Sequence, residues 1–233
     1  MYRLIDRQPD FIIIDKAPGV AVHRDQEAQG LLDVLRADLG CDSLHLVHRL
    51  DAITSGLMVL ATHRDAARTL SQAFHDHQVD KFYLALSDRK PARKQGWVTG
   101  DMDRGRRGSW RLLPTRVNPA ITRFFSVSVE PGVRAFLLRP RTGRTHQLRV
   151  ALKSLGSPLL GDPLYHAADA ANAAADRAYL HHYAFAFELG GRRWRYVQPP
   201  TTGVHFLAAP FVAALGRFDD PWALDWPESC LTR

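Results

Sequence analysis

Residues 44–61 have the sequence LHLVHRLDAITSGLMVLA. The loosely alternating apolar residues at its start predict one strand (44–50), and the apolar run at its end predicts a second (57–61). The segment between them is rich in turn-forming residues, and Asp51 is the first of these. Loops held by rigid strands often carry catalytic groups, so Asp51 is a candidate catalytic residue. Taken alone, it is better explained as a turn aspartate that bonds nearby backbone N–H groups.

The segments around this stretch predict a protein with more strands than helices. Apolar runs and alternating patterns predict strands at 11–15, 81–86, 121–138, 183–189 and 193–197. Helical spacing of apolar residues predicts helices at 31–39 (closed by Gly40), 65–77 and 145–155. Residues 167–178 fit either a helix or a loop, and the tail after Pro199 has no clear period. Strands that occur in runs favour an α+β fold with a mixed, largely antiparallel sheet flanked by helices and loops.

The composition limits the partners and the compartment. The chain has 233 residues, a net charge of +7 and a pI of about 9.8, so it should attract polyanions such as nucleic acid or an acidic membrane surface. A membrane-surface role has little support, because no strongly amphipathic basic helix is evident. No apolar leader or membrane span occurs, and Cys41 and Cys230 fit no metal-ligand or disulfide pattern. We therefore expect a cytoplasmic protein with reduced thiols.

A second segment rich in charge, residues 139–149, has the sequence RPRTGRTHQLR. Its four arginines lead into a predicted helix, and helix N-termini and arginines both favour phosphate groups. Arg149 lies beside the apolar positions of that helix, where a cation is partly desolvated and usually has a carboxylate partner. Asp51 is the candidate for that partner. Tyr83, in a predicted strand, fits either a core position or a residue that stacks on a base.

Several familiar site patterns are absent from the sequence. The adjacent pair His181-His182 is not at metal-ligand spacing, and there is no H-E-x-x-H motif, no G-x-S-x-G elbow and no phosphate-binding loop. The sequence therefore predicts no metal centre. Residues 87–116 are polar and rich in arginine and lysine, which predicts surface loops with hairpin strands. We expect contacts with the phosphates of a nucleic acid there from Arg104, Arg106 and Arg107.

Residues 48–57, HRLDAITSGL, resemble the signature H-R-L-D-x-x-T-S-G-L of the RluA-type pseudouridine synthases at every fixed position. Further segments resemble other elements of this family in the same order: KFY at 81–83, GRTHQLRV at 143–150 and GDPLY at 161–165. The opening strand and its KAPG turn, within 11–19, also resemble the family. The resemblance covers about residues 10–200.

This resemblance implies a function and a set of site residues. The chain is expected to isomerise uridine in ribosomal or transfer RNA to pseudouridine, on a flipped-out nucleotide and with neither cofactor nor metal. It implies that Asp51 is the essential carboxylate, that Arg49 fills the space of the departed base, and that Tyr83 stacks on the target base. Arg149 would pair with Asp51, and Leu148 would pack beneath the site. The remaining predicted substrate contacts are His48, Thr54, Arg144, His146 and Gln147.

The chain also departs from the family pattern. Ala151 stands where many relatives have a histidine, and we expect one catalytic domain (1–233, core 10–200) without a separate N-terminal RNA-binding domain. The role of residues 201–233 is open, and nothing in the sequence requires a partner, so we expect a monomer. Two other functions stay open: an RNA-binding module without activity, and a hydrolase that releases the base to water.

Overall fold

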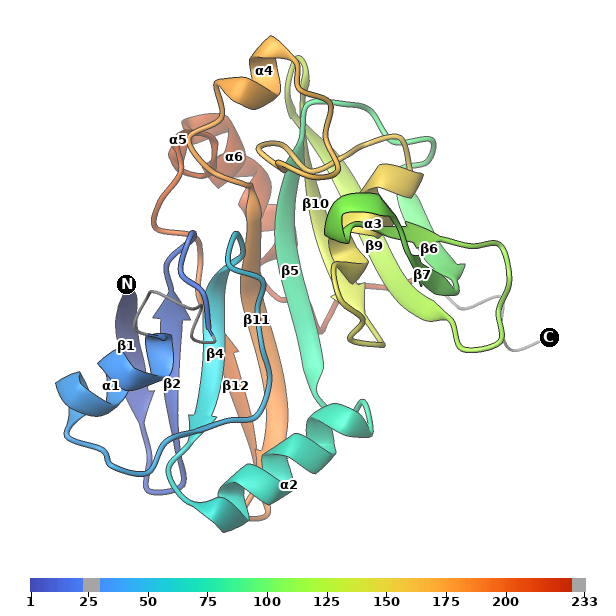
Figure 1. Cartoon of the computed structure of the whole chain (residues 1–233). Helices are drawn as coiled ribbons and strands as arrows, with labels where there is room; N and C mark the ends of the chain where they lie inside the picture. Colours follow the sequence, from blue (N-terminus) through green and yellow to red (C-terminus); the bar gives the residue numbers. More distant parts are fainter. Residues whose placement is uncertain (23–29, 228–233) are drawn as a thin grey trace. The chain divides into compact units, whose positions relative to one another are not determined.

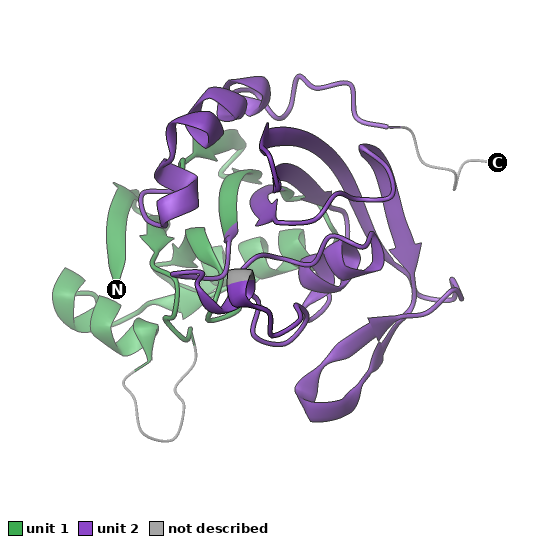
Figure 2. Cartoon of the chain, turned by 90° about the horizontal axis from the view of Figure 1, so that it is seen from above, with its two compact units in different colours: residues 1–81, 181–199 green, residues 82–180, 200–233 purple. Residues whose placement is uncertain are grey.

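A computed structural model of the chain describes residues 1–22 and 30–227. The chain divides into two compact units, and each is described by itself. Unit 1 contains residues 1–81 and 181–199, and unit 2 contains 82–180 and 200–233 (Figure 2). The single domain expected from the sequence stays a prediction. Cys41 is a free thiol, and Cys230 lies outside the described residues.

Unit 1 is built on strands that pair in the order β1-β2-β4-β11 (Figure 1), and β12 pairs with β11 off this path. Their bounds are β1 Tyr2–Arg7, β2 Phe11–Lys16, β4 Ser55–Ala61, β11 Leu180–Leu189 and β12 Arg192–Val197. A two-residue strand, β3 (His45–Leu46), also pairs with β4. All these pairs are antiparallel except β4 with β11, which is parallel.

The core of unit 1 explains why its strands form. Every residue of β2 and of β4 is buried, as expected for strands enclosed by neighbours. Helix α2 (Arg64–His75) packs Ala66, Leu70 and Ala73 into the same cluster of buried residues as the apolar side chains of β2, β4 and β11. Each fully buried leucine or phenylalanine of this kind contributes roughly 1.5–3 kcal/mol. Helix α1 (Leu31–Leu39) ends at Gly40, which adopts the left-handed conformation as expected.

Gly56 allows the parallel strand to approach β4. Its φ is +112°, and a Cβ atom built on it would lie 2.4 Å from the carbonyl oxygen of His182 in β11. The opposing atom is backbone, so it cannot swing aside. Only glycine fits here, which gives a physical reason for the glycine at the start of β4, directly after Thr54 and Ser55.

Unit 2 contains four antiparallel strands in the order β5-β10-β9-β6 and a separate two-stranded hairpin, β7–β8 (Figure 1). The strand bounds are β5 Asp80–Ser87, β6 Gln95–Gly100, β7 Met102–Arg104, β8 Trp110–Leu112, β9 Ala120–Glu130 and β10 Val133–Pro140. The α-helices are α3 Gln147–Ser154, α4 Ala170–Ala173, α5 Val204–Leu207 and α6 Ala209–Leu215. Single turns of 3₁₀-helix occur at Arg106–Gly108 and Gly216–Phe218. The mixed, largely antiparallel character predicted from the sequence is confirmed.

Two predicted elements need correction, and one open choice is settled. The strand expected at 44–50 is wrong for most of its length, since only His45 and Leu46 pair with β4. Helix α3 begins at Gln147, two residues later than predicted, because His146 before it has a left-handed backbone. In 167–178, which fits a helix or a loop, only the short α4 is helical. Strand β1 and helices α5 and α6 were not predicted.

Within the described residues, no helix combines the length and the apolar composition needed to cross a membrane.

Candidate active site

Asp51 lies in the turn that precedes β4, and backbone hydrogen bonds hold this turn at both ends. The N–H of Thr54 donates to the carbonyl of Asp51 at 3.0 Å. The next carbonyl, that of Ala52, accepts from the N–H of Gly19 at 2.8 Å. The turn after β2 is therefore fastened to the turn that carries Asp51.

Lys16 strengthens this fastening, a role that sequence analysis missed. Its side chain is fully buried, and Nζ donates to the carbonyls of Ala17 (2.9 Å), Val20 (2.9 Å) and Ala52 (3.1 Å). Three carbonyl acceptors match the three donors of an ammonium group. The signal was present in the sequence, since a lysine at the end of a buried apolar strand must find such partners.

The side chains around the turn differ in exposure. Asp51 is half-buried and Arg49 is exposed, whereas Thr54 is buried. Arg49 can thus meet a ligand from solvent without rearrangement. Thr54 is enclosed by protein, and its predicted contact with the substrate stays a prediction.

His48 has a structural environment within unit 1. Its Nε2 accepts the N–H of Val59 at 3.1 Å, and its ring stacks on Phe74 with centroids 4.4 Å apart. Burial, together with the positive charge of Lys81, lowers the pKa of His48 to about 3. The imidazole is therefore neutral near pH 7. These contacts assign it a packing role, and its contact with RNA stays a prediction.

In unit 2, Tyr83 lies within β5, with its Cα paired to that of Leu138 in β10. Its residue is 9% exposed, so little more than an edge of the side chain reaches solvent. The strand pairing fixes the face of the sheet on which the side chain lies. Its stacking on a base stays a prediction.

Arg149 has the carboxylate partner that its burial demands. The residue is 5% exposed, and its Nε and Nη2 donate to the two oxygens of fully buried Asp162 at 2.7 and 2.8 Å. The same carboxylate accepts the N–H groups of Leu164 and Tyr165. A bidentate pair of this kind fixes the guanidinium in one orientation. Sequence analysis did not foresee Asp162 as a partner, and the predicted pairing of Arg149 with Asp51 stays a prediction.

The start of α3 is organised around Tyr165. The guanidinium of Arg149 lies 4.8 Å from the centroid of its ring. Its hydroxyl lies 2.8 Å from Nδ1 of His146 and accepts the N–H of Trp110 at 2.8 Å. His146, with φ of +57°, is half-buried, and Leu148 is buried. Tyr165 thus connects Arg149, His146 and the β7–β8 hairpin.

Gln147 builds the loop that enters α3. Its Oε1 accepts from the Thr142 hydroxyl (2.8 Å) and from the N–H of Arg144 (2.9 Å). Its Nε2 donates to the Ile121 carbonyl (3.1 Å) and to the Thr122 hydroxyl (3.0 Å). Protein groups thus take both amide protons and two acceptor positions. This points to a role in holding the exposed Arg144 in place, and direct contact of Gln147 with RNA stays a prediction.

The predicted phosphate contacts lie on a surface hairpin, as expected for residues 87–116. Arg104 ends β7, and Arg106 and Arg107 lie in the connection to β8, all three exposed. Arg104 lies 5.7 Å from the ring centroid of Trp110. Their exposure is compatible with phosphate binding, which stays a prediction.

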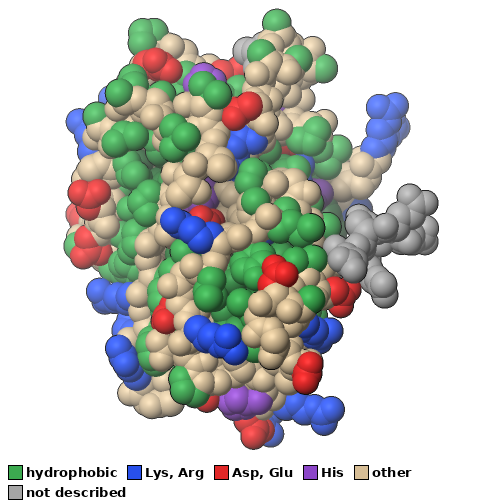
Figure 3. All heavy atoms as spheres, turned by 90° about the vertical axis from the view of Figure 1, so that its left-hand side faces the viewer, with side chains coloured by type: hydrophobic (Ala, Val, Ile, Leu, Met, Phe, Trp, Pro, Cys, Tyr) green, Lys and Arg blue, Asp and Glu red, His purple; other side chains and the backbone are tan. Residues whose placement is uncertain are grey.

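The net positive charge of the chain is not gathered into one patch on the face shown in Figure 3. Lysine and arginine side chains are scattered there among acidic and apolar ones.

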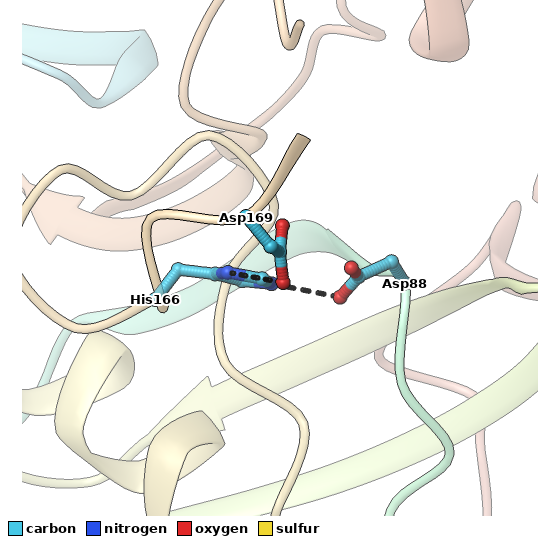
Figure 4. Close-up of side chains that lie close together, drawn as sticks. All are labelled: Asp88, His166 and Asp169. Carbon is cyan, nitrogen blue, oxygen red and sulfur yellow. Dashed lines mark hydrogen bonds and ion pairs between the residues drawn. The ribbon is translucent and has the colours of Figure 1, made fainter. Parts of the chain in front are cut away.

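One cluster in unit 2 has the geometry of a metal site, although the sequence predicts none. Asp88, His166 and Asp169 each offer a ligand atom, all within 4.8 Å of one another (Figure 4). His166 Nε2 lies 2.8 Å from Asp88, and Arg89 donates to Asp169 at 3.0 Å. Burial disfavours the imidazolium, but hydrogen bonds to Asp88 and to the Ala167 carbonyl outweigh it and raise the pKa of His166. Arg89 and, when protonated, His166 supply positive charge beside the two carboxylates.

Comparisons with known proteins agree with the fold and the motifs. A family model described as RNA pseudouridylate synthase matches residues 10–154. A Haemophilus influenzae protein described as an uncharacterized RNA pseudouridine synthase is 50% identical over 185 residues, which cover 79% of this chain and 81% of the relative. The Zymomonas mobilis protein named ribosomal large subunit pseudouridine synthase D is 33% identical over 159 residues (64% of this chain, 50% of the relative).

A solved structure has the same fold. Human RNA Pseudouridylate Synthase Domain Containing 1 gives a TM-score of 0.73 at 24% identity, covering 86% of this chain and 84% of that one. Together with the match over residues 10–154, this shows that the chain belongs to the RNA pseudouridylate synthase family, enzymes that isomerise uridine in RNA to pseudouridine.

Proposed function

We propose that this enzyme modifies uridine in ribosomal or transfer RNA and that Asp51 is its single catalytic carboxylate. One observation carries the assignment of Asp51. All the fixed positions of the signature in residues 48–57 are present, and they fall on a turn that Lys16 and Gly19 fasten from a second segment. A turn held so firmly suits a catalytic group, which must keep one position against its substrate.

The chemistry requires a broken and a remade bond. The N1–C1′ bond of the uridine breaks, the base turns within the site, and C5 bonds to C1′ while its proton is lost and N1 gains one. Atoms and electrons balance without an oxidant. Water must not attack C1′ while the base is detached. A single carboxylate suits this reaction, whereas glycoside hydrolases that pass the sugar to water use two. Asp51 could begin it by attack on C1′, by attack on C6 or by removal of a ribose proton.

The other predicted residues have roles in the same proposal. A stacked nucleotide must leave the helix before its glycosidic bond can be reached, and Arg49 would fill the space it leaves. Tyr83 would stack on the flipped base and assist proton transfer at C5. Arg149 would keep Asp51 ionised, because a neighbouring cation favours the carboxylate form. The bidentate bond from Arg149 to Asp162 supports this role, because it holds the guanidinium still.

The Asp51→Asn variant tests the catalytic assignment. The substitution keeps the size of the side chain and removes its charge, so pseudouridine formation, detected by carbodiimide labelling, should be lost. The exposed Asp42→Asn is the matched control and should convert uridine at the wild-type rate. An Asp51→Asn enzyme that still isomerises uridine would refute the assignment. Release of free uracil by the wild type would favour the hydrolase instead.

The RNA target is proposed from one relative's name and from the sequence resemblance. The Zymomonas relative is named for the large ribosomal subunit, which makes ribosomal RNA the first candidate and transfer RNA the second. Mapping carbodiimide-labelled pseudouridines in cellular RNA with and without the gene would identify the target as the site that disappears.

We also propose that the enzyme is cytoplasmic, since its expected substrates are cytoplasmic in bacteria, the source of the Haemophilus and Zymomonas relatives. We further propose that it is a monomer, as expected from the sequence. Sedimentation and cell fractionation test these two points.

A further inference from the structure

A cavity in unit 2 has an unusual set of charges. It has a volume of about 500 Å³ and lies between the ends of β6, β9 and β10 and helix α6. Three cations line it: Lys94, Arg134 and Arg217. None of the other described residues that line it is acidic, and two of them, Ser126 and Ser128, offer hydroxyl groups. Cations placed together without carboxylates repel one another, and an anion relieves that repulsion.

The polar groups of the cavity are held in place by one serine. The Ser126 hydroxyl donates to the Lys94 carbonyl at 2.9 Å, and the Ser126 N–H donates to the same oxygen at 2.6 Å. Nη2 of Arg134 reaches the Ser126 carbonyl and hydroxyl at 3.4 and 3.3 Å. Ser126 thus connects the start of β6 with β10. The Arg134 side chain and the Lys94 backbone are therefore anchored to the sheet.

One hydrogen-bond donor of the Arg134 guanidinium has no acceptor among the described residues. This donor is Nε, which is buried. A buried donor without a partner is destabilising. Protein covers this atom, so an anion in the cavity reaches it only when the Arg134 side chain shifts, and such a shift would satisfy the donor as well as the charge.

The remaining lining residues indicate which part of an anionic polymer fits. They are Val127, Val129, Pro210, Ala213 and Ala214, which are apolar and mostly small. None of the described lining residues is aromatic, so no base can stack on an aromatic side chain there. The small apolar wall suits a sugar, and the three cations suit phosphates. This combination recognises a nucleic-acid backbone without reading its sequence.

We propose that this cavity binds the sugar–phosphate backbone of the substrate RNA away from the target uridine; the choice of RNA as the polyanion rests on the function proposed above. Arg134 pairs with Ser87 in β5, whereas Tyr83 pairs with Leu138. The cavity is thus displaced four residues along β10 from the position of Tyr83, roughly 13 Å at the rise of a strand. It grips a different nucleotide from the one that is modified.

The test measures how RNA affinity depends on salt. Lys94 and Arg217 are both exposed, so Lys94→Gln with Arg217→Gln removes two charges with little risk to folding. The matched control removes two exposed charges from α2 in unit 1, Arg64→Gln with Arg68→Gln. Labelled poly(U) and poly(A) oligonucleotides are titrated at several salt concentrations. For the cavity variant, which lacks two cations, the slope of log affinity against log salt should fall in magnitude by about 1.4 to 2 relative to the control.

The loss should be equal for poly(U) and poly(A), because the cavity contacts backbone alone. A slope that matches the control overturns the proposal, as does a loss confined to one of the two sequences. Arg134→Gln gives an independent reading and should add to the loss, provided that its melting temperature shows a folded protein. Uridine conversion is assayed separately: a wild-type enzyme that converts no uridine refutes the proposed function, while the salt slopes still decide the cavity.

Discussion

Replacing Lys16 by methionine tests whether the buried ammonium holds the Asp51 turn. The change keeps most of the volume of the side chain and removes three hydrogen bonds to the carbonyls of Ala17, Val20 and Ala52. Each bond contributes roughly 1 kcal/mol net, and carbonyls left without a donor cost more. Relief from burying a charge offsets part of this loss. We therefore expect the free energy of unfolding to fall by about 2–4 kcal/mol.

The same variant should lose activity even where it is folded. Ala52 is adjacent to Asp51, and a displacement of about 1 Å at a catalytic group can cost roughly 10²-fold in rate. Urea unfolding followed by tryptophan fluorescence measures the stability. Conversion of uridine at saturating RNA, without urea, measures the rate.

The exposed Lys90→Met serves as the stability control and should stay within about 0.5 kcal/mol of the wild type. A folded Lys16→Met enzyme with the wild-type rate would refute the positioning role. A stability loss no larger than that of the control would refute the energetic argument.

Three further predictions concern single side chains. Asp162→Asn leaves the buried guanidinium of Arg149 without its charged partner, so urea unfolding should show a loss of about 3–5 kcal/mol; a loss under 1 kcal/mol would contradict the pair. Gly56→Ala places a methyl group 2.4 Å from the carbonyl oxygen of His182, so we expect little folded protein by circular dichroism, and a normal melting curve would show that the parallel strand can move. The folded pKa of His166 lies above its ordinary value of 6.5, so the stability it provides is complete below that pH and is lost as the pH rises through the folded pKa. His166→Asn should thus lower the melting temperature most in acid, and a loss independent of pH would count against this.

Segments enclosed by protein on both sides were the most predictable part of the fold. Residues of β2 and β4 form continuous apolar runs, and nothing competes with the strand conformation there. The strand predicted at 44–50 failed because His48 uses its ring to bond the Val59 N–H and to stack on Phe74. This tertiary contact leaves no trace in the apolar pattern. Strand β1 was missed for the opposite reason, since it is largely exposed and its residues show no regular alternation.

The site was predicted in its residues more than in its contacts. The motifs predict Asp51, Tyr83 and Arg149 as site residues, and these roles stay predictions. The expectation that a partly desolvated Arg149 has a carboxylate partner is confirmed. Asp162 as that carboxylate could not be derived, because nothing in the spacing distinguishes it from any other aspartate. Lys16 was overlooked although its place at the end of a buried strand indicates that it needs acceptors. Which acceptors it has could not be derived, because they are three backbone carbonyls and backbone groups carry no sequence signal.

The parallel pairing of β4 with β11 has a consequence for how the chain is made. His181, which pairs with Ser55, lies 120 residues after Ala61, the end of β4. At roughly 5–20 residues per second, a ribosome needs about 6–24 s to synthesise that interval. Throughout it, the core of unit 1 lacks the aromatic side chains of Phe185 and Phe187. During this interval the nascent chain has an incomplete hydrophobic core in unit 1. We expect aggregation and chaperone binding to be most frequent then.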